Sequence, residues 1–247
     1  MKAKWEVSDL RSGAVLLLLL AVPLGVLVLL GSVFATVLDD VTENDDLAML
    51  DAPVSGLVHY AREPWLSRFF EVVTWAGSAI LLAPLMLLVG LYLRQVTSRW
   101  RSLTFLVVSL LGASVLSKLI KSAVARPRPF AVALVEADGY GFPSGHSTAA
   151  IAAWLALALA LGAGTPRWGP KVALVSTALV IAGLVGLSRV YLGVHEPTDV
   201  LGGWSLGALW VVTVRLIDSE HLRRLIRGHV RFGKQSAPQR APHGAGR

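Results

Sequence analysis

The sequence PSGHSTAAIAAWLALALALG occupies residues 143–162, and it joins a short polar block directly to an uninterrupted apolar run. With the residues up to 164, this run is long enough to cross the roughly 30 Å hydrocarbon core of a bilayer. Backbone amides and carbonyls meet no water in that core, so a spanning segment has to be a helix. The stretch therefore predicts a membrane helix that begins with a polar turn containing a histidine.

Five more stretches have the same apolar character. The expected spans lie at approximately 13–38, 70–93, 102–124, 146–164, 170–192 and 199–217. The first follows Lys2, Lys4 and Arg11 and is similar to a signal peptide, but its apolar run exceeds the usual core of roughly 7–15 residues. We interpret it as a retained span. The fold class is therefore predicted to be all-α, a polytopic membrane protein with six transmembrane helices.

Composition narrows the function further. Hydrophobic residues make up 54% of the chain and charged residues 16%, which fits a membrane protein. The absence of cysteine excludes disulfides, thiolate metal sites and cysteine nucleophiles. The net charge of +7 comes largely from Lys and Arg in short loops and in the C-terminal tail, where they set topology or contact anionic lipid. Nucleic acid is therefore not an expected partner, and the sequence leaves the oligomeric state open.

The distribution of Lys and Arg predicts the orientation, because cationic loops are poorly translocated. Most of them fall on the side of both termini when the N-terminus is placed in the cytoplasm. The protein is thus expected in the cell membrane with both termini cytoplasmic. Residues 1–227 are expected to form the membrane domain, and residues 228–247 a basic, disordered cytoplasmic tail.

The segment between the first two spans has a different pattern. An acidic run ends at Asp46, and apolar residues then recur at mostly helical spacing from 47 to 69. An interfacial helix is expected there. It is either a surface for substrate access or a connector that lies on the membrane.

The first of three polar blocks follows the third span. Lys121 ends that span, and Arg126-Pro127-Arg128-Pro129 prevents simple continuation of the helix, because each proline lacks an amide donor and restricts its neighbour. Lys121 and Arg128 would be presented to an anion by this loop. The alternative is that basic side chains at a membrane boundary only reach toward the headgroups, and this alternative is strongest for Lys118 and Arg126.

The second block, Pro143-Ser144-Gly145-His146, opens the fourth span. Amides without a partner inside the helix and a positive helix dipole make such an end an anion site. Gly145 permits close approach of the backbone, Ser144 adds a hydroxyl, and His146 can protonate a departing oxygen. An ordinary helix cap with an incidental histidine is the alternative.

The third block runs from Ser188-Arg189 to His195 and Asp199. Asp199 can accept a hydrogen bond from one nitrogen of His195, which leaves the other nitrogen unprotonated and able to attack phosphorus. Arg189 adds a third cation suited to a phosphoryl group. The alternative is a polar pair that only caps the sixth span.

The three blocks resemble the type-2 phosphatidic acid phosphatase superfamily, whose signature is K-x6-RP, PSGH and SR-x5-H-x3-D and whose phosphate site is shared with vanadium-dependent haloperoxidases. Every signature position is filled here. With both termini cytoplasmic, the active site is expected at the extracytoplasmic ends of helices 3 to 6. A soluble haloperoxidase is not favoured, because six spans leave no aqueous core.

The resemblance also implies roles for individual residues. His195 would form a phosphohistidine, Asp199 would orient it, and His146 would protonate the leaving group. The phosphoryl oxygens would be held by five residues: Lys121, Arg128, Ser144, Gly145 and Arg189. The family reaction needs no magnesium, so we expect no cofactor and no metal.

The predicted function is therefore metal-independent hydrolysis of a membrane lipid phosphate. Undecaprenyl diphosphate, phosphatidylglycerophosphate and phosphatidate are the candidate substrates, and the sequence does not rank them. One alternative is a lipid phosphotransferase that uses the same residues with an acceptor other than water. Another is a lipid-phosphate binder or transporter without catalysis.

Overall fold

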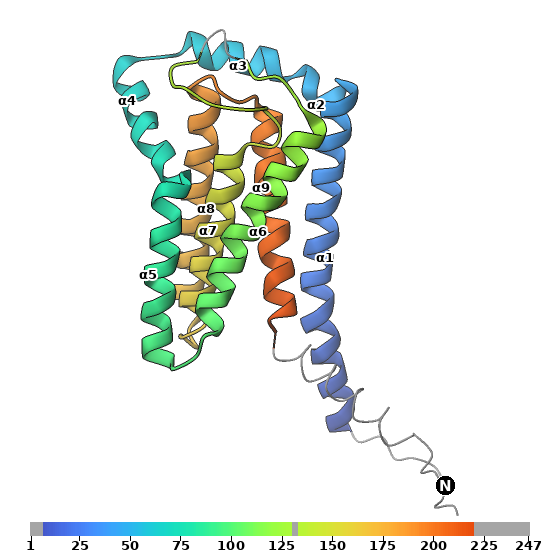
Figure 1. The fold of residues 1–247 in the computed structure, drawn as a ribbon. Coiled ribbons are helices and arrows are strands. Elements are labelled where there is room, and N and C mark those ends of the chain that lie inside the picture. The colour runs from blue at the N-terminus through green and yellow to red at the C-terminus, as the bar shows by residue number, and fades with distance from the viewer. Residues whose placement is uncertain (1–6, 130–132, 220–247) are drawn as a thin grey trace, which may run out of the picture.

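The structure, a computed structural model, describes residues 7–129 and 133–219, and in these ranges every regular element is helical (Figure 1). The elements, in chain order, are α1 (Val7–Glu43), α2 (Asp46–Met49), α3 (Asp51–Tyr60), α4 (Pro64–Val73), the 3-10 helix η1 (Thr74–Gly77), α5 (Ala79–Thr97), α6 (Arg101–Val124), α7 (Gly145–Gly162), α8 (Trp168–Tyr191) and α9 (Pro197–Ile217). The predicted tail at 228–247 lies outside the described residues.

Six of these helices are long and apolar enough to cross a membrane, as the sequence predicted. They are α5 to α9 and the part of α1 from Ala21 to Glu43. The chain is therefore an all-α, multi-pass membrane protein. Because the number of spans is even, α1 begins and α9 ends at the same end of the bundle (Figure 1).

Two predicted boundaries were wrong. The second span begins at Ala79 and not near residue 70, because Ser78 has an extended backbone (φ −77°, ψ 135°) and accepts a hydrogen bond from the Ile80 amide as the N-cap of α5. Residues 70–77 belong instead to α4 and η1. The first helix continues past residue 38 to Glu43, so part of the acidic run is helical.

The centre of the bundle is α7, which packs against α6, α8 and α9. Its alanines, such as Ala149, Ala153 and Ala156, are fully or nearly fully buried. Small side chains let neighbouring backbones approach closely, which is the usual basis of helix packing in membranes. Two glycines of α9 mark this close approach: a Cβ at Gly203 would lie 2.8 Å from the Ser144 carbonyl oxygen, and a Cβ at Gly207 would lie 2.6 Å from the Thr148 carbonyl oxygen.

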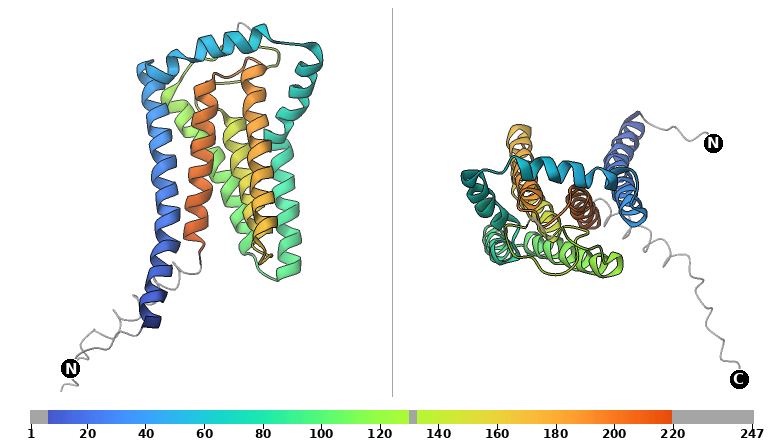
Figure 2. Two further views of the ribbon diagram at one scale, coloured as in Figure 1. Left: turned by 180° about the vertical axis from the view of Figure 1, so that it is seen from behind. Right: turned by 90° about the horizontal axis from the view of Figure 1, so that it is seen from above.

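The segment predicted to contain an interfacial helix forms three short helices, α2, α3 and α4. Figure 2 shows α3 crossing over one end of the bundle, at an angle to the spans, between the end of α1 and the start of α4. The C-terminal ends of α6 and α8 and the N-terminal ends of α7 and α9 lie beneath it (Figures 1 and 2). All three polar blocks are therefore at the end of the bundle that α3 covers.

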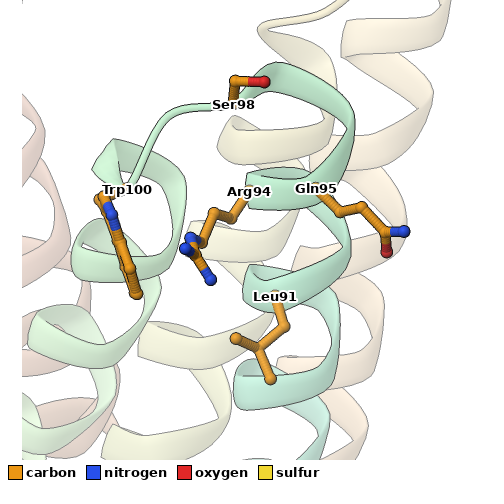
Figure 3. A pocket seen from close by; sticks show the side chains of 5 residues that line it. All are labelled: Leu91, Arg94, Gln95, Ser98 and Trp100. Atoms are coloured by element: carbon orange, nitrogen blue, oxygen red, sulfur yellow. The ribbon is translucent and has the colours of Figure 1, made fainter.

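A surface pocket lies at the opposite end, where α5 turns into α6. Its lining includes Leu91, Gln95 and Trp100, and the Arg94 guanidinium stacks 3.6 Å from the centroid of the Trp100 ring (Figure 3). None of the three blocks contributes to this pocket.

Candidate active site

The first block leaves α6 where the prolines predicted. α6 ends at Val124, and Ala125 adopts a left-handed conformation (φ 52°) that turns the chain away from the helix axis. Arg126 and Arg128 follow on a non-helical segment. The loop therefore presents both arginines to the end of the bundle beside Lys121, which lies in the last turn of α6.

His195 and Asp199 are in contact across the start of α9. Glu196 is the N-cap of this helix, Asp199 is its third residue, and the Glu196 amide donates to Asp199 Oδ2 at 3.1 Å. The same carboxylate oxygen lies 3.1 Å from His195 Nδ1. Asp199 is completely buried and His195 is 2% exposed. The Glu196 amide at the helix cap thus holds the Asp199 carboxylate, and this carboxylate orients the His195 imidazole.

The contact with Arg128 shows which ring nitrogen of His195 carries the proton. Arg128 Nη1 lies 3.0 Å from His195 Nε2, and a guanidinium can only donate, so Nε2 must accept. Nδ1 then carries the proton and donates to Asp199. Burial lowers the pKa of His195 to about 4, although the hydrogen bond and charge of Asp199 act in the opposite direction. The imidazole is therefore neutral at pH 7, with its Nε2 lone pair on the side of Arg128.

Lys121 and Arg128, the two cations of the first block, both donate to backbone carbonyls of the loop at residues 138–141. Lys121 Nζ donates to the carbonyl oxygens of Tyr140 and Gly141, at 2.5 and 3.1 Å. Arg128 donates from Nε to the Gly139 carbonyl and from Nη2 to the Asp138 carbonyl, at 2.8 and 2.7 Å. Carbonyls bear only partial charge, so these contacts hold the cations in place, and no carboxylate of the described residues forms an ion pair with either of them.

The second block caps α7. Ser144 is the N-cap, completely buried, and its Oγ accepts from the Ser147 hydroxyl at 3.0 Å. A Cβ added at Gly145 would meet no atom within 4 Å, so there is open space beside this amide. His146 is partly exposed, and the positive charge of Arg189 acts on it. The start of α7 thus combines free amides, space and a second imidazole.

Arg189 is held by a residue that the sequence did not single out. Its Nη1 donates to Thr74 Oγ1 of η1 at 2.7 Å, and the residue is 4% exposed. Its Nε is buried and has no hydrogen-bond partner among the residues that the structure describes. A buried guanidinium with an unused donor is suited to an anion. Thr74 lies in a stretch that we assigned to the second span, and no sequence pattern marks it.

Arg126, whose role the sequence left open, has carboxylate partners, unlike Lys121 and Arg128. It donates from Nη1 to Asp199 Oδ1 and from Nη2 to Asp51 Oδ2, both at 2.7 Å. Although burial opposes its charge, Asp199 and Asp51 together raise the pKa of Arg126. Lys118, by contrast, is exposed on α6 and belongs to none of the ion pairs found in the described ranges.

The site carries an excess of positive charge. Within residues 7–129 and 133–219, Arg101 and Arg126 form ion pairs with carboxylates, and the neutral His195 is hydrogen-bonded to Asp199. Lys121, Arg128 and Arg189 have no carboxylate within ion-pair distance, and their charges act on one another. Placing these three cations in one site lowers the stability of the folded protein unless an anion is bound there. The arrangement can bind a dianionic phosphoryl group next to Nε2 of His195.

The described ranges contain no group of three or more His, Asp or Glu side chains placed to bind a metal ion. Asp51 and Asp199 are instead joined through Arg126.

Comparison with known proteins places the chain among lipid phosphatases. Residues 102–222 match the model of the PAP2 superfamily. Phosphatidylglycerophosphatase B of Bacillus subtilis is 37% identical over 172 residues, which cover 69% of this chain and 84% of that protein. Undecaprenyl-diphosphatase of Sulfolobus acidocaldarius is 36% identical over 112 residues, 43% of this chain and 50% of that protein.

A solved structure agrees with these relatives. The crystal structure of a transmembrane PAP2 type phosphatidylglycerolphosphate phosphatase from Bacillus subtilis superposes with a TM-score of 0.69 at 31% identity. It covers 79% of this chain and 95% of the other. The region that matches the family model, residues 102–222, contains the spans that carry the three blocks.

Proposed function

This chain belongs to the PAP2 superfamily, and we propose that it hydrolyses a lipid phosphate or isoprenyl diphosphate through a phosphohistidine at His195. One observation carries the proposal: within the described residues, Lys121, Arg128 and Arg189 lack carboxylate partners, and Arg128 contacts a histidine whose Nδ1 is held by Asp199. The cations would bind the phosphoryl oxygens, and the unprotonated Nε2, once Arg128 turns to the phosphoryl group, would provide the nucleophile.

In the first step, the Nε2 lone pair of His195 forms a bond to phosphorus. The bond between phosphorus and the leaving oxygen breaks, and His146 gives that oxygen a proton. Asp199 stabilises the positive charge that the imidazole gains. Lys121, Arg128 and Arg189, with the Ser144 hydroxyl and the Gly145 amide, offset the charge on the three equatorial oxygens.

In the second step, a water oxygen attacks phosphorus on the enzyme. The bond between Nε2 and phosphorus breaks, its electron pair returns to His195, and His146 takes the proton of the water. Free phosphate leaves. Three protein cations supply the positive charge that a metal provides in many phosphatases, which supports a reaction independent of magnesium.

We assign the substrate to membrane lipids whose phosphate lies at headgroup depth. The site lies at the ends of four spanning helices, where such a phosphate would meet it. The names of the relatives support phosphatidylglycerophosphate and undecaprenyl diphosphate as candidates, together with phosphatidate. Hydrolysis of a monophosphate would release a lipid alcohol, and hydrolysis of a diphosphate would release a lipid monophosphate.

The deciding experiment measures phosphate release by detergent-purified protein in EDTA. Wild type is compared with His195→Ala on undecaprenyl diphosphate, phosphatidylglycerophosphate and phosphatidate, with His229→Ala in the tail as the matched control. We expect release in EDTA by wild type and the control and none by His195→Ala. A brief reaction with ³²P-labelled lipid, quenched in alkali, should leave label on wild type only.

Other outcomes point elsewhere. Loss of activity in EDTA that magnesium restores would contradict the metal-free mechanism. Label transferred to added lipid or sugar hydroxyls instead of water would indicate a phosphotransferase. Binding of all three lipids without turnover would indicate a binder or transporter.

We also propose that the site is extracytoplasmic and that both termini are cytoplasmic, as the Lys and Arg distribution favours. The chain has no cysteine, so single-cysteine variants can be labelled without background. Glu63→Cys, exposed at the end covered by α3, should react with a membrane-impermeant maleimide in intact cells. Ser236→Cys should react only after permeabilisation, and the reverse pattern would overturn this orientation.

A further inference from the structure

The helix α3, which crosses the end of the bundle, is polar toward the protein and apolar on its outer face. Asp51, Ser55 and His59 are spaced by four residues and so lie on one side of the helix. Asp51 and Ser55 are buried, whereas Leu57 and Tyr60 are 72% and 93% exposed. This is the reverse of a helix that merely covers a protein surface. The inward polar face therefore has a specific set of partners.

Asp51 meets the start of α9 with both of its carboxylate oxygens. Oδ1 accepts from the Thr198 amide at 2.9 Å, and Oδ2 accepts from the Thr198 hydroxyl at 2.5 Å. Oδ2 also accepts from Arg126 Nη2 at 2.7 Å. The residue is 3% exposed, so this is a buried carboxylate satisfied by three donors. One of its two partners, Thr198, directly precedes Asp199 in the chain.

Arg126 connects Asp51 to the nucleophile. While Nη2 is held by Asp51, Nη1 donates to Asp199 Oδ1 at 2.7 Å and to the Thr198 hydroxyl at 2.8 Å. Asp199 then uses its other oxygen for His195 Nδ1. A planar guanidinium that binds two carboxylates with its two ends has one orientation available. A continuous series of hydrogen bonds therefore connects Asp51 of α3 to the His195 imidazole.

We propose that Asp51 is a positioning residue for the phosphatase reaction, which holds Arg126 in the orientation that fixes Asp199 and hence His195. The inference rests on the proposed function. Asp51 has a second effect, because its charge offsets that of Arg126. Without it, the full charge of Arg126 would act on Asp199 and weaken the support that Asp199 gives to the imidazolium formed in the first step.

Asp51→Asn tests this with little change of shape. It keeps an acceptor for the Thr198 amide but removes the charge that holds Arg126. We expect kcat to fall on the order of 10- to 100-fold, as for a small misplacement of a reacting group, with KM for the lipid changed less than about twofold. Phosphate release by detergent-purified protein gives both constants.

Two control variants separate positioning from general support of the fold. Ser55→Ala removes the other tether of α3, the hydrogen bond from Ser55 to Glu196 Oε2 at 2.5 Å. Asp39→Asn removes an exposed carboxylate on α1. Both should retain kcat within about threefold. If Ser55→Ala lost as much activity as Asp51→Asn, α3 would act only as a structural cover and the proposal would be wrong.

A double-mutant cycle gives the sharper result. If Asp51 acts through Arg126, then Asp51→Asn combined with Arg126→Gln should be no slower than Arg126→Gln alone. Multiplicative losses would overturn the proposal, as would a kcat for Asp51→Asn equal to that of wild type. Should Asp51→Asn fail to fold, Arg126→Lys serves in its place, because lysine keeps the charge and cannot hold both carboxylates. It should then show the same loss of kcat at constant KM, and an unchanged kcat would overturn the proposal.

Failure of this inference is distinguishable from failure of the proposed function. Phosphate release by His195→Ala would contradict the phosphohistidine mechanism itself. An inactive His195→Ala together with a fully active Asp51→Asn would contradict only the role of Asp51.

Discussion

Arg128 is in direct contact with His195, with its Nη1 3.0 Å from Nε2, while Asp199 binds the other ring nitrogen. One imidazole is thus held between a cation and a carboxylate. Arg128 also binds two carbonyls of the 138–141 loop through Nε and Nη2. The guanidinium is therefore oriented by the loop toward the atom that would attack phosphorus.

We predict that Arg128→Lys lowers kcat by about 100-fold, because lysine keeps the charge but cannot contact the loop and a phosphoryl oxygen at once. Phosphate release measures this. Arg68→Lys, a change at an exposed arginine of α4, is the control and should be fully active. An Arg128→Lys protein with normal kcat would show that charge alone suffices at this position.

A second prediction concerns the pH dependence of stability. The pKa of His195 is about 4 in the folded protein and about 6.5 when unfolded, so the unfolded chain binds more protons between these values. Stability from the neutral imidazole is present above pH 6.5 and is lost as the pH falls toward 4. At pH 5 the loss should be about 2 kcal/mol.

Thermal unfolding in detergent at pH 7.5 and pH 5 checks this value. His195→Gln has no such titration and should lose less stability than wild type over this range. Equal losses in the two proteins would mean that the pKa of His195 is not lowered.

Thr74 should matter for phosphate affinity. Thr74→Val removes the acceptor for Arg189 Nη1 and leaves a buried guanidinium with a lost hydrogen bond. We expect binding of vanadate or inorganic phosphate to weaken by about 10-fold, measured by inhibition of turnover. The control is Thr97→Val at the other end of α5, where the hydroxyl only contacts the Leu93 carbonyl of its own helix. Unchanged inhibition in Thr74→Val would show that Arg189 needs no such support.

Gly203 sets the distance between α9 and the start of α7. A methyl group there would lie 2.8 Å from the Ser144 carbonyl and 2.9 Å from the Ser147 Cβ. Gly203→Ala should destabilise the protein by about 2 kcal/mol through overpacking. It should also lower kcat, because Asp199 would move away from Ser144. Gly183→Ala in α8, where an added Cβ meets nothing within 4 Å, should not destabilise the protein and should leave kcat unchanged.

Hydropathy predicted most of the fold, because a bilayer leaves the backbone few choices. Six spans were expected, and six helices of the described residues are long and apolar enough to cross a membrane. The start of the second span was wrong because the apolar pattern continues through residues 70–77, and hydropathy does not register the turn at Ser78. The interfacial segment was expected to be helical and is, but its division into α2, α3 and α4 depends on packing against the bundle.

Motif spacing predicted which residues of the candidate site would lie together, and the structure places His195 against Asp199 and Arg128. Their catalytic roles remain predictions. No role could be predicted for Arg126, because its charge alone does not say whether a phosphate or a carboxylate is its partner. Asp51 had one usable signal, the polar stripe of Asp51, Ser55 and His59 at a spacing of four on an otherwise apolar helix.

The sequence by itself determined the membrane class, the number of spans and the local placement of the three blocks at helix ends. These features depend on hydropathy and on backbone preferences over a few residues. Only the tertiary structure decided which distant residues support the site. Asp51 is 147 residues from Thr198, and Thr74 is 115 residues from Arg189. Contacts over such separations exist only after the helices pack, because the path of α3 and η1 over the bundle brings these side chains to their partners.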